Sequence, residues 1–368
     1  MSKARQLADL GNVYDDGALS NRNLIINGAM KVAQRGTSFT GLTNGNTDYT
    51  LDRWRWSEGG TISFVTDVTQ DTSAPDGFAS SYKIAVTTAA PSLGANHSLR
   101  LMTRLEGQDL QQTAFGTSNA KNLTLSFWVK SNKTGTYIAW FYNNDAARQI
   151  AKAYTVDAAD TWEYKALTID GDTISGFTND NGVSIQLEFV LAAGSDYTSG
   201  TLATTWQADN NANRYVGNVN LADSTSNYWQ ITGVQLEVGD TATPFEHRSY
   251  GDELARCERY FQRSWHTAAN SGNSSTYPGT VTGRAADTGA LDVHVQFRTQ
   301  LRSAPTFTFY RAGVAGNLYN VDTAGTVSSV NLSQSWFDAN GINGFLATGG
   351  PFTAGTRYGF DYDMDAEL

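Results

Sequence analysis

Hydrophobic and polar residues alternate with a period of two along much of the chain, which indicates β-strands with one face in a core. The clearest runs are residues 123–129, 183–191 and 291–297. Links rich in Gly, Asn and Asp separate these runs, as in sheets built from many short strands. We therefore predict a mainly all-β protein, with a jelly-roll or β-sandwich domain over residues 23–248 and a second, smaller β-sandwich-like distal domain over residues 264–368.

The alternation slips by one residue inside the run at residues 229–238. Trp229 and Ile231 share one parity, whereas Val234, Leu236 and Val238 share the other. A one-residue slip turns side chains to the wrong face unless an extra residue bulges out of the strand. Glycine adopts the bulge conformation at low cost. The pattern predicts a β-bulge at Gly233.

The pattern changes to helical spacing after residue 248. Ser249 and Asp252 resemble a capping box, and Leu254, Cys257 and Phe261 recur at i, i+3 and i+7. We predict a connector helix over residues 249–263. Cys257 then lies on the buried side as a small apolar residue.

The first 22 residues form a separate segment. Ala4, Leu7 and Leu10 make one apolar stripe on a short helix. Such a helix is marginal in water by itself, so we expect these three residues to dock on a partner. The segment has no apolar core of a secretory signal, and the chain has no run of about 18 apolar residues, so we expect neither export nor membrane insertion.

The last strand pattern carries acids at every second position, Asp361, Asp363, Asp365 and Glu367. Charged rows of this kind prevent an edge strand from pairing with other chains. We expect a closing strand whose acidic face is solvated.

Composition narrows the classes of function. The chain has 36 acidic against 26 basic residues and a net charge of -10, which argues against binding to nucleic acid. Its single cysteine excludes an intrachain disulfide and a cysteine metal cluster. The sequence shows no zinc-protease, nucleophile-elbow or phosphate-loop motif. We expect no enzyme, although carboxylate pairs such as Asp170 and Asp172 leave a glycan depolymerase as an alternative.

The best binding signal is an aromatic segment next to polar residues at positions 336–341. Sugars present flat apolar faces and hydroxyl edges, so an exposed ring beside amide and carboxylate groups suits them. We therefore take Trp336, Phe337, Asp338 and Asn340 as glycan-binding candidates.

Four stretches resemble bacteriophage fibre and virion-associated proteins with a carbohydrate-binding-module-like jelly roll: ARQLADLGN at residues 4–12, NLIINGAM at 23–30, GVQLEVG at 233–239 and LRSAPT at 301–306. The resemblance implies a symmetric virion appendage, with a trimer as the expected oligomer. Related modules often hold a structural calcium near their first and last strands. Asn27 and Glu237 lie at about those places and are the calcium candidates; we expect no other cofactor.

Together these observations predict a structural subunit of a phage virion appendage, a tail fibre on the virion surface. Residues 1–22 would attach it to other virion proteins, and residues 264–368 would form a tip that contributes to attachment to host-surface polysaccharide. Two alternatives stay open. One is a capsid fibre or decoration protein without a receptor role, and the other is a polysaccharide-degrading tailspike.

Overall fold

The computed structural model describes residues 21–43, 48–264, 281–311, 314–323, 325–328 and 330–368. Within these ranges the chain forms two compact units. The first contains the described residues up to Ser249 except Gln34–Gly36, which belong to the second unit together with Tyr250–Leu368. The predicted docking residues Ala4, Leu7 and Leu10 lie outside the described residues, and their role stays a prediction.

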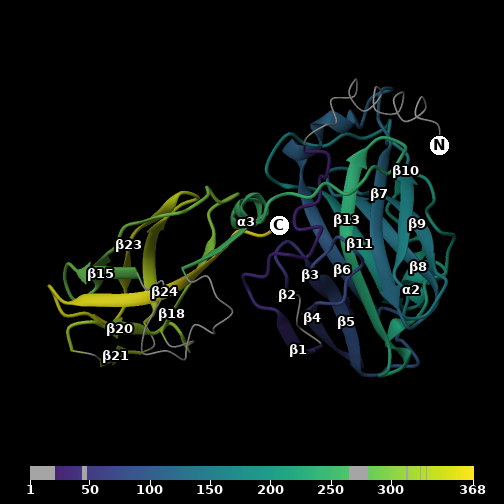
Figure 1. Ribbon diagram of the computed structural model, residues 1–368. Helices are drawn as coiled ribbons and strands as arrows, with labels where there is room; N and C mark the ends of the chain where they lie inside the picture. Colours follow the sequence, from purple (N-terminus) through teal and green to yellow (C-terminus); the bar gives the residue numbers. More distant parts are fainter. Residues whose placement is uncertain (1–20, 44–47, 265–280, 312–313, 324, 329) are drawn as a thin grey trace. The chain divides into compact units, whose positions relative to one another are not determined.

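Two antiparallel sheets make up the first unit (Figure 1). The six-stranded sheet has the spatial order β1 (Ser38–Leu42), β4 (Val65–Asp71), β5 (Ser81–Thr88), β13 (Tyr228–Val238), β7 (Leu123–Ser131) and β10 (Glu163–Ile169). The seven-stranded sheet has the order β12 (Gln207–Ala208), β9 (Arg148–Val156), β8 (Gly135–Asn143), β11 (Val183–Ala193), β6 (Ser98–Glu106), β3 (Arg55–Gly59) and β2 (Asp48–Tyr49). Four short helices lie in the connections: η1 (Gly107–Thr113), α2 (Ser195–Thr198), η2 (Asn211–Asn213) and η3 (Leu221–Asp223).

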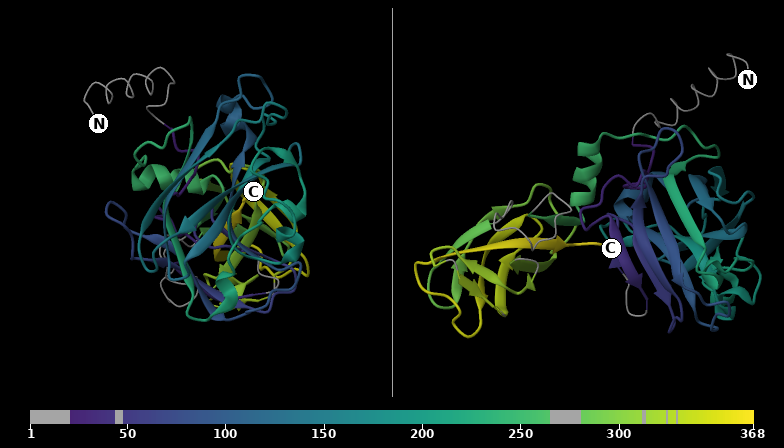
Figure 2. Two further views of the ribbon diagram at one scale, coloured as in Figure 1. Left: turned by 90° about the vertical axis from the view of Figure 1, so that its right-hand side faces the viewer. Right: turned by 60° about the horizontal axis from the view of Figure 1, so that its bottom comes forward.

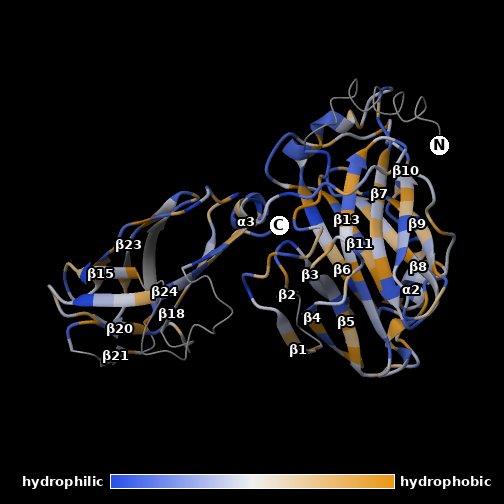
Figure 3. Ribbon diagram, in the orientation of Figure 1, coloured by the Kyte–Doolittle hydropathy of each residue, from blue (hydrophilic) through white to orange (hydrophobic). Residues whose placement is uncertain are grey.

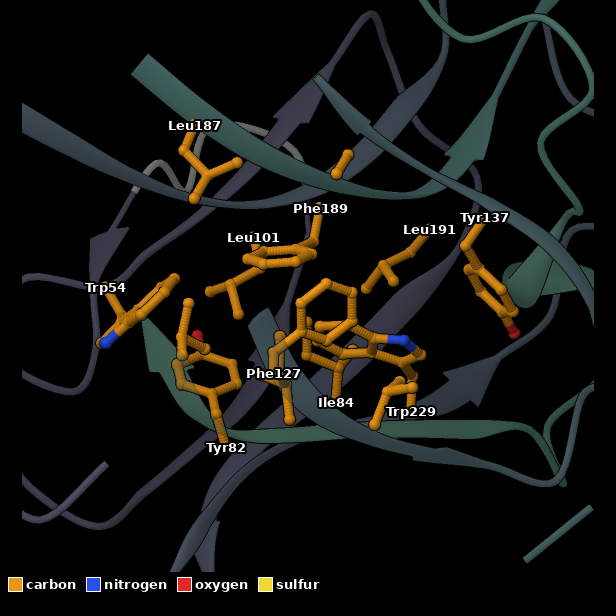
Figure 4. Packing of buried hydrophobic residues seen from close by; sticks show 14 of the residues in the cluster. Trp54, Tyr82, Ile84, Leu101, Phe127, Tyr137, Leu187, Phe189, Leu191 and Trp229 are labelled. Atoms are coloured by element: carbon orange, nitrogen blue, oxygen red, sulfur yellow. The ribbon is translucent and has the colours of Figure 1, made fainter. Parts of the chain in front are cut away.

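The main core fills the space between the two sheets. Figure 4 shows side chains of the six-stranded sheet, among them Phe127 and Trp229, opposite side chains of the seven-stranded sheet, among them Phe189. The Phe127 and Phe189 rings meet edge to face with their centroids 5.0 Å apart. Hydrophobic and hydrophilic bands alternate along the strands, because every second side chain enters this core (Figure 3). The prediction of a mainly all-β, sandwich-type protein is confirmed.

The β-bulge predicted at Gly233 is present. The register between β13 and β7 shifts between Thr232 and Gln235, and Gly233 has a φ of +62°. A positive φ is the conformation that glycine adopts without the steric cost of a Cβ atom. The bulge restores the parity that the sequence breaks, so Ile231, Val234 and Leu236 are all buried.

The outer face of the seven-stranded sheet is more deeply covered than the alternation predicts. Glu188 of β11 lies on the polar side of its strand, yet it is fully buried. Trp140, Val190 and Tyr215 form a second apolar cluster on this face. Tyr215 comes from the connection between β12 and β13, which therefore covers part of a surface that alternation alone assigns to solvent.

The second unit is built around its last strand, β24 (Arg357–Asp365). The other strands in the described part of this unit are β14 (Phe261–Arg263), β15 (Val281–Ala285), β16 (Ala290–Asp292), β17 (Val295–Gln296), β18 (Thr306–Arg311), β19 (Val314–Ala315), β20 (Leu318–Asn320), β21 (Gly325–Val327), β22 (Leu332–Phe337) and β23 (Gly341–Ala347). The first half of β24 pairs with β15 and β20, and its second half pairs with β14 and β18. Figure 2 shows β24, the last strand of the chain, in two further orientations.

The predicted helix over residues 249–263 is shorter than expected. The helix α3 covers Tyr250–Glu258, and Phe261–Arg263 form the strand β14, which pairs with β24. Phe261 is therefore a buried residue of a strand and not of the helix. Cys257 is a buried residue of the helix, as predicted. In the part of the chain that the structure describes, no helix is long and apolar enough to cross a membrane.

The acidic row at the end of the chain is not a solvated edge, which corrects our expectation. β24 has partners on both sides along its length. Asp361 is buried, Asp363 pairs with Arg263 at 3.2 Å, and Asp365 pairs with Arg35 at 3.1 Å, all within the second unit. Arginines from other segments compensate the negative charges of Asp363 and Asp365. The sequence of the strand alone does not predict these ion pairs.

Candidate functional site

Five aromatic side chains gather on the outer face of the six-stranded sheet, and we call this set the aromatic face: Phe78, Trp128, Trp162, Tyr164 and Tyr228. Leu125, Phe127 and Val129 of β7 fill the core, so Trp128, on the opposite parity, points outward. Tyr164 of β10 lies directly opposite Trp128 in the register and therefore shares its face. The strand order β10, β7, β13 places Tyr228 of β13 on the other side of β7.

Trp128, which is partly exposed, and Tyr164, which is exposed, form a pair of rings on this face. Their centroids are 5.4 Å apart and their planes meet at 55°. A parallel stack would cover one face of each ring, whereas this tilt leaves ring surface available to a ligand. Tyr164 is 46% exposed, which is high for a large apolar side chain. The pair thus presents aromatic surface to solvent.

A second group of rings surrounds the ammonium of Lys130. The Lys130 Nζ lies 5.2 Å from the Trp162 ring centroid and 5.9 Å from that of Tyr228. It also donates a hydrogen bond to Ser73 Oγ at 2.7 Å. The Tyr228 hydroxyl donates to Asp160 Oδ1 at 2.5 Å. Burial lowers the pKa of Lys130, and burial together with the Asp160 carboxylate raises the pKa of Tyr228.

Gly233, the residue of the bulge, lies next to the rings of both Phe78 and Trp128. A Cβ atom at Gly233 would lie 2.6 Å from Phe78 Cζ and 3.2 Å from Trp128 Cδ1. Both rings therefore rest over a residue without a side chain. Phe78 also contacts Phe245, with ring centroids 5.1 Å apart, and His247 at 5.2 Å, so the row of rings continues beyond the bulge.

We expect Gly233→Ala to lower the free energy of unfolding by about 1–3 kcal/mol, because it strains a positive-φ backbone and displaces the Phe78 ring. Urea unfolding followed by tryptophan fluorescence measures the change. Gly217→Ala is the matched control, since Gly217 has a φ of +91° and a Cβ atom at this position would meet nothing within 4 Å. Equal losses from the two variants would show that Gly233 matters for its backbone alone.

The glycan-binding candidates at residues 336–341 lie at the hairpin between β22 and β23. Trp336 and Phe337 end β22, and Asp338 and Asn340 lie in the turn. Asp338 Oδ1 accepts hydrogen bonds from the backbone N–H groups of Asn340 at 2.7 Å and Gly341 at 3.2 Å. The Asn340 N–H bond holds the pKa of Asp338 below its usual range. Asp338 therefore stabilises the turn, and glycan binding at this segment stays a prediction.

The two calcium candidates are both engaged with protein groups. Asn27 is buried, its Nδ2 donates to the carbonyl oxygens of Val32 and Asp52, and its Oδ1 accepts from the Val32 N–H, each at 2.9 Å. Glu237 accepts from the Thr243 backbone N–H at 2.8 Å and from its hydroxyl at 2.6 Å. Within the described ranges, no group of three or more His, Cys, Asp or Glu side chains could hold a metal ion.

Asp170 and Asp172, the carboxylate pair considered for glycan hydrolysis, lie in different environments. Asp172 is buried and pairs with Arg148 at 2.6 Å, whereas Asp170 is exposed and lies 3.6 Å from Lys152. Both carboxylate oxygens of Asp172 accept hydrogen bonds from Arg148, at 2.6 Å and 3.3 Å. Glycoside hydrolysis needs two carboxyl groups that face the sugar from either side of the scissile bond. This geometry does not favour the pair as catalytic groups.

Sequence reasoning did not assemble the aromatic face. Trp128 is an apolar residue at a polar position of the alternation in residues 123–129, and this is a signal that the sequence does contain. The other four rings come from other strands and connections, and only the spatial order of the strands brings them together.

The fold and the face define a mainly antiparallel β protein with an outward-facing aromatic surface. No protein-family model and no curated protein sequence matches the chain. Solved structures similar to it include the enzymatically active domain of tailspike protein 4 from bacteriophage CBA120, at 13% identity and a TM-score of 0.31 over 59% of this chain and 21% of that one. The chain thus spans about a fifth of that tailspike chain.

Carbohydrate-binding modules with jelly-roll folds are also among the similar structures. TmCBM61 in complex with β-1,4-galactotriose has 11% identity and a TM-score of 0.30 over 59% of this chain and 99% of that one. A family 11 module from Clostridium thermocellum has 11% identity and a TM-score of 0.26 over 56% and 99%. With scores this low, the likeness carries no inference about what this chain binds.

Proposed function

We propose that this protein binds glycans through the aromatic face of its first unit. The observation that carries the proposal is the pair Trp128 and Tyr164, two rings held on one sheet face with one of them 46% exposed. Exposed rings placed on a rigid sheet lose little conformational entropy when a ligand stacks on them. The apolar face of a sugar ring is a suitable partner for such a surface.

Polar groups beside the rings supply the directional contacts that a sugar needs. Lys83 and Lys130 offer ammonium donors, while Asp71 and Asp160 offer carboxylate acceptors. Sugar hydroxyls can both donate and accept hydrogen bonds, as serine and threonine hydroxyls do. Rings with a few fixed polar groups are typical of small-ligand sites in proteins.

We further propose that the protein is a subunit of a phage virion appendage and acts as a homo-oligomer, with a trimer as the expected state. This part is supported by the resemblance of residues 4–12, 23–30, 233–239 and 301–306 to phage fibre proteins. Several copies of a weak site would bind a repetitive host-surface polysaccharide with high avidity. In this proposal binding is not followed by cleavage.

A glycan-binding screen of the whole chain tests the proposal. We expect saccharide binding that Tyr164→Ala weakens and that the control Tyr250→Ala leaves unchanged, since Tyr250 is an exposed ring at 57% on the second unit. New reducing ends on incubation with polysaccharide would contradict the absence of cleavage. Failure to find the chain in purified particles by mass spectrometry would contradict the virion role, and no binding to any glycan would contradict the proposal as a whole.

A further inference from the structure

We infer that the aromatic face selects an uncharged glycan, an inference that rests on the function proposed above. The observation behind it is the arrangement of two lysines and two aspartates among the rings. Lys83 Nζ pairs with Asp71 Oδ2 at 3.2 Å and lies 5.2 Å from the Tyr228 ring centroid. The Tyr228 hydroxyl donates a hydrogen bond to Asp160 Oδ1.

Lys130 interacts electrostatically with both of these carboxylates. Asp71 and Asp160 both attract its ammonium, and Lys83 repels it, so the four groups act on one another electrostatically. The register places Lys130 and Lys83 on either side of Gln230, in one row across β7, β13 and β5. Two of these four groups are positive and two are negative, so their formal charges cancel.

This balance favours a neutral ligand for a simple physical reason. A carboxylate or sulfate that approaches Lys130 also approaches the carboxylates of Asp71 and Asp160, and like charges in contact cost several kcal/mol at an interface. A cationic sugar meets the same obstacle from the lysines. A hydroxyl accepts from an ammonium and donates to a carboxylate, so a polyol satisfies both kinds of group without excess charge.

The spacing of the rings also indicates a chain of sugars rather than a single one. Trp128 and Lys130 are two residues apart on one face of β7, which is about 7 Å along the strand. The first position carries the Trp128 and Tyr164 rings, and the second carries Trp162 and Tyr228 around Lys130. Two adjacent sugar units running along β7 would each meet a pair of rings.

Calorimetric titration with neutral and acidic oligosaccharides of equal length tests this inference. We would use gluco- and galacto-oligosaccharides against oligogalacturonate. We expect at least about tenfold tighter binding of a neutral set, and less than about twofold change in its affinity between about 0.05 and 0.5 M NaCl. Preference for oligogalacturonate, weakened by salt, would overturn the inference and leave glycan binding intact. Binding to neither class would overturn the proposed function together with it.

Asp160→Asn gives a sharper test because it unbalances the charges without a large change of shape. Asp160 has a φ of +59°, a conformation that asparagine tolerates, and the new amide oxygen can still accept from Tyr228. We expect this variant to gain affinity for oligogalacturonate in a salt-dependent way. Asp196→Asn, the same charge change on the exposed helix α2, is the control and should gain none. Equal gains in the two variants, or none in either, would contradict a charge-balanced site.

Discussion

Glu188→Ala should lower the free energy of unfolding of the first unit by about 3–5 kcal/mol, the usual cost of removing one partner from a buried ion pair. Glu188 is fully buried, and its Oε1 accepts from Arg100 at 3.1 Å and from Gln186 at 2.7 Å. Its Oε2 accepts from the Tyr215 hydroxyl at 2.6 Å. The substitution leaves the Arg100 guanidinium and two further groups without this acceptor. Urea unfolding followed by tryptophan fluorescence measures the loss.

An exposed ion pair of the same unit provides the control for this measurement. Asp157 pairs with Lys165 at 3.1 Å, and its side chain is 71% exposed, so Asp157→Ala should cost less than about 1 kcal/mol. Replacing both buried partners, as in Arg100→Met with Glu188→Leu, should recover much of the loss because no unpaired charge is left. A Glu188→Ala variant no less stable than Asp157→Ala would contradict the buried network.

Trp128→Ala should weaken glycan binding by about thirtyfold, which corresponds to about 2 kcal/mol for the loss of a central aromatic contact. Trp128 lies between Tyr164 and the Phe78 ring, so its removal opens the middle of the aromatic face. It does not belong to the main core, and the unit should therefore keep its fold. Titration of the wild type and the variant with the glycan found by screening measures the effect.

Two further variants distinguish the loss of a ligand contact from a loss of affinity caused by misfolding. Trp128→Phe keeps an aromatic ring and should retain most of the affinity. Tyr250→Ala removes an exposed ring from the second unit and should change nothing. If Trp128→Ala binds as tightly as the wild type while circular dichroism shows a native fold, the aromatic face is not the binding site.

The fold was predictable to the extent that it follows from local alternation. The period of two in residues 123–129 and 183–191 identifies strands that do pack one face in the core, and the slip at Thr232 and Gly233 marks a bulge that is present. These features depend on neighbours within a few residues of each other. A single sequence therefore contains the information needed to find them.

Features that depend on distant segments were not predictable in this way. The alternation predicts that Glu188 faces solvent. It is buried because the connection that carries Tyr215 folds over its strand. The acidic row of β24 predicts a solvated face, whereas Arg263 and Arg35 form ion pairs with two of its acids. In both places, segments more than 20 residues away decide the environment of a side chain.

The binding face shows the same limit most clearly. Sequence composition pointed to the segment at residues 336–341, where aromatic and polar residues are neighbours in the chain. The aromatic face instead combines residues from β7, β10, β13 and two connections, and the order β10, β7, β13 makes them neighbours in space. The alternation in residues 123–129 singles out Trp128, but it does not show which strands lie side by side.

A crystal structure of the chain with a bound oligosaccharide would show whether the aromatic face is the glycan-binding site. We expect sugar rings against Trp128 and Tyr164, with hydroxyls within hydrogen-bond distance of Lys130 or Asp160, on the outer face of the six-stranded sheet. An oligosaccharide bound elsewhere, on the seven-stranded sheet or at the β22–β23 hairpin, with the aromatic face empty, would contradict this expectation.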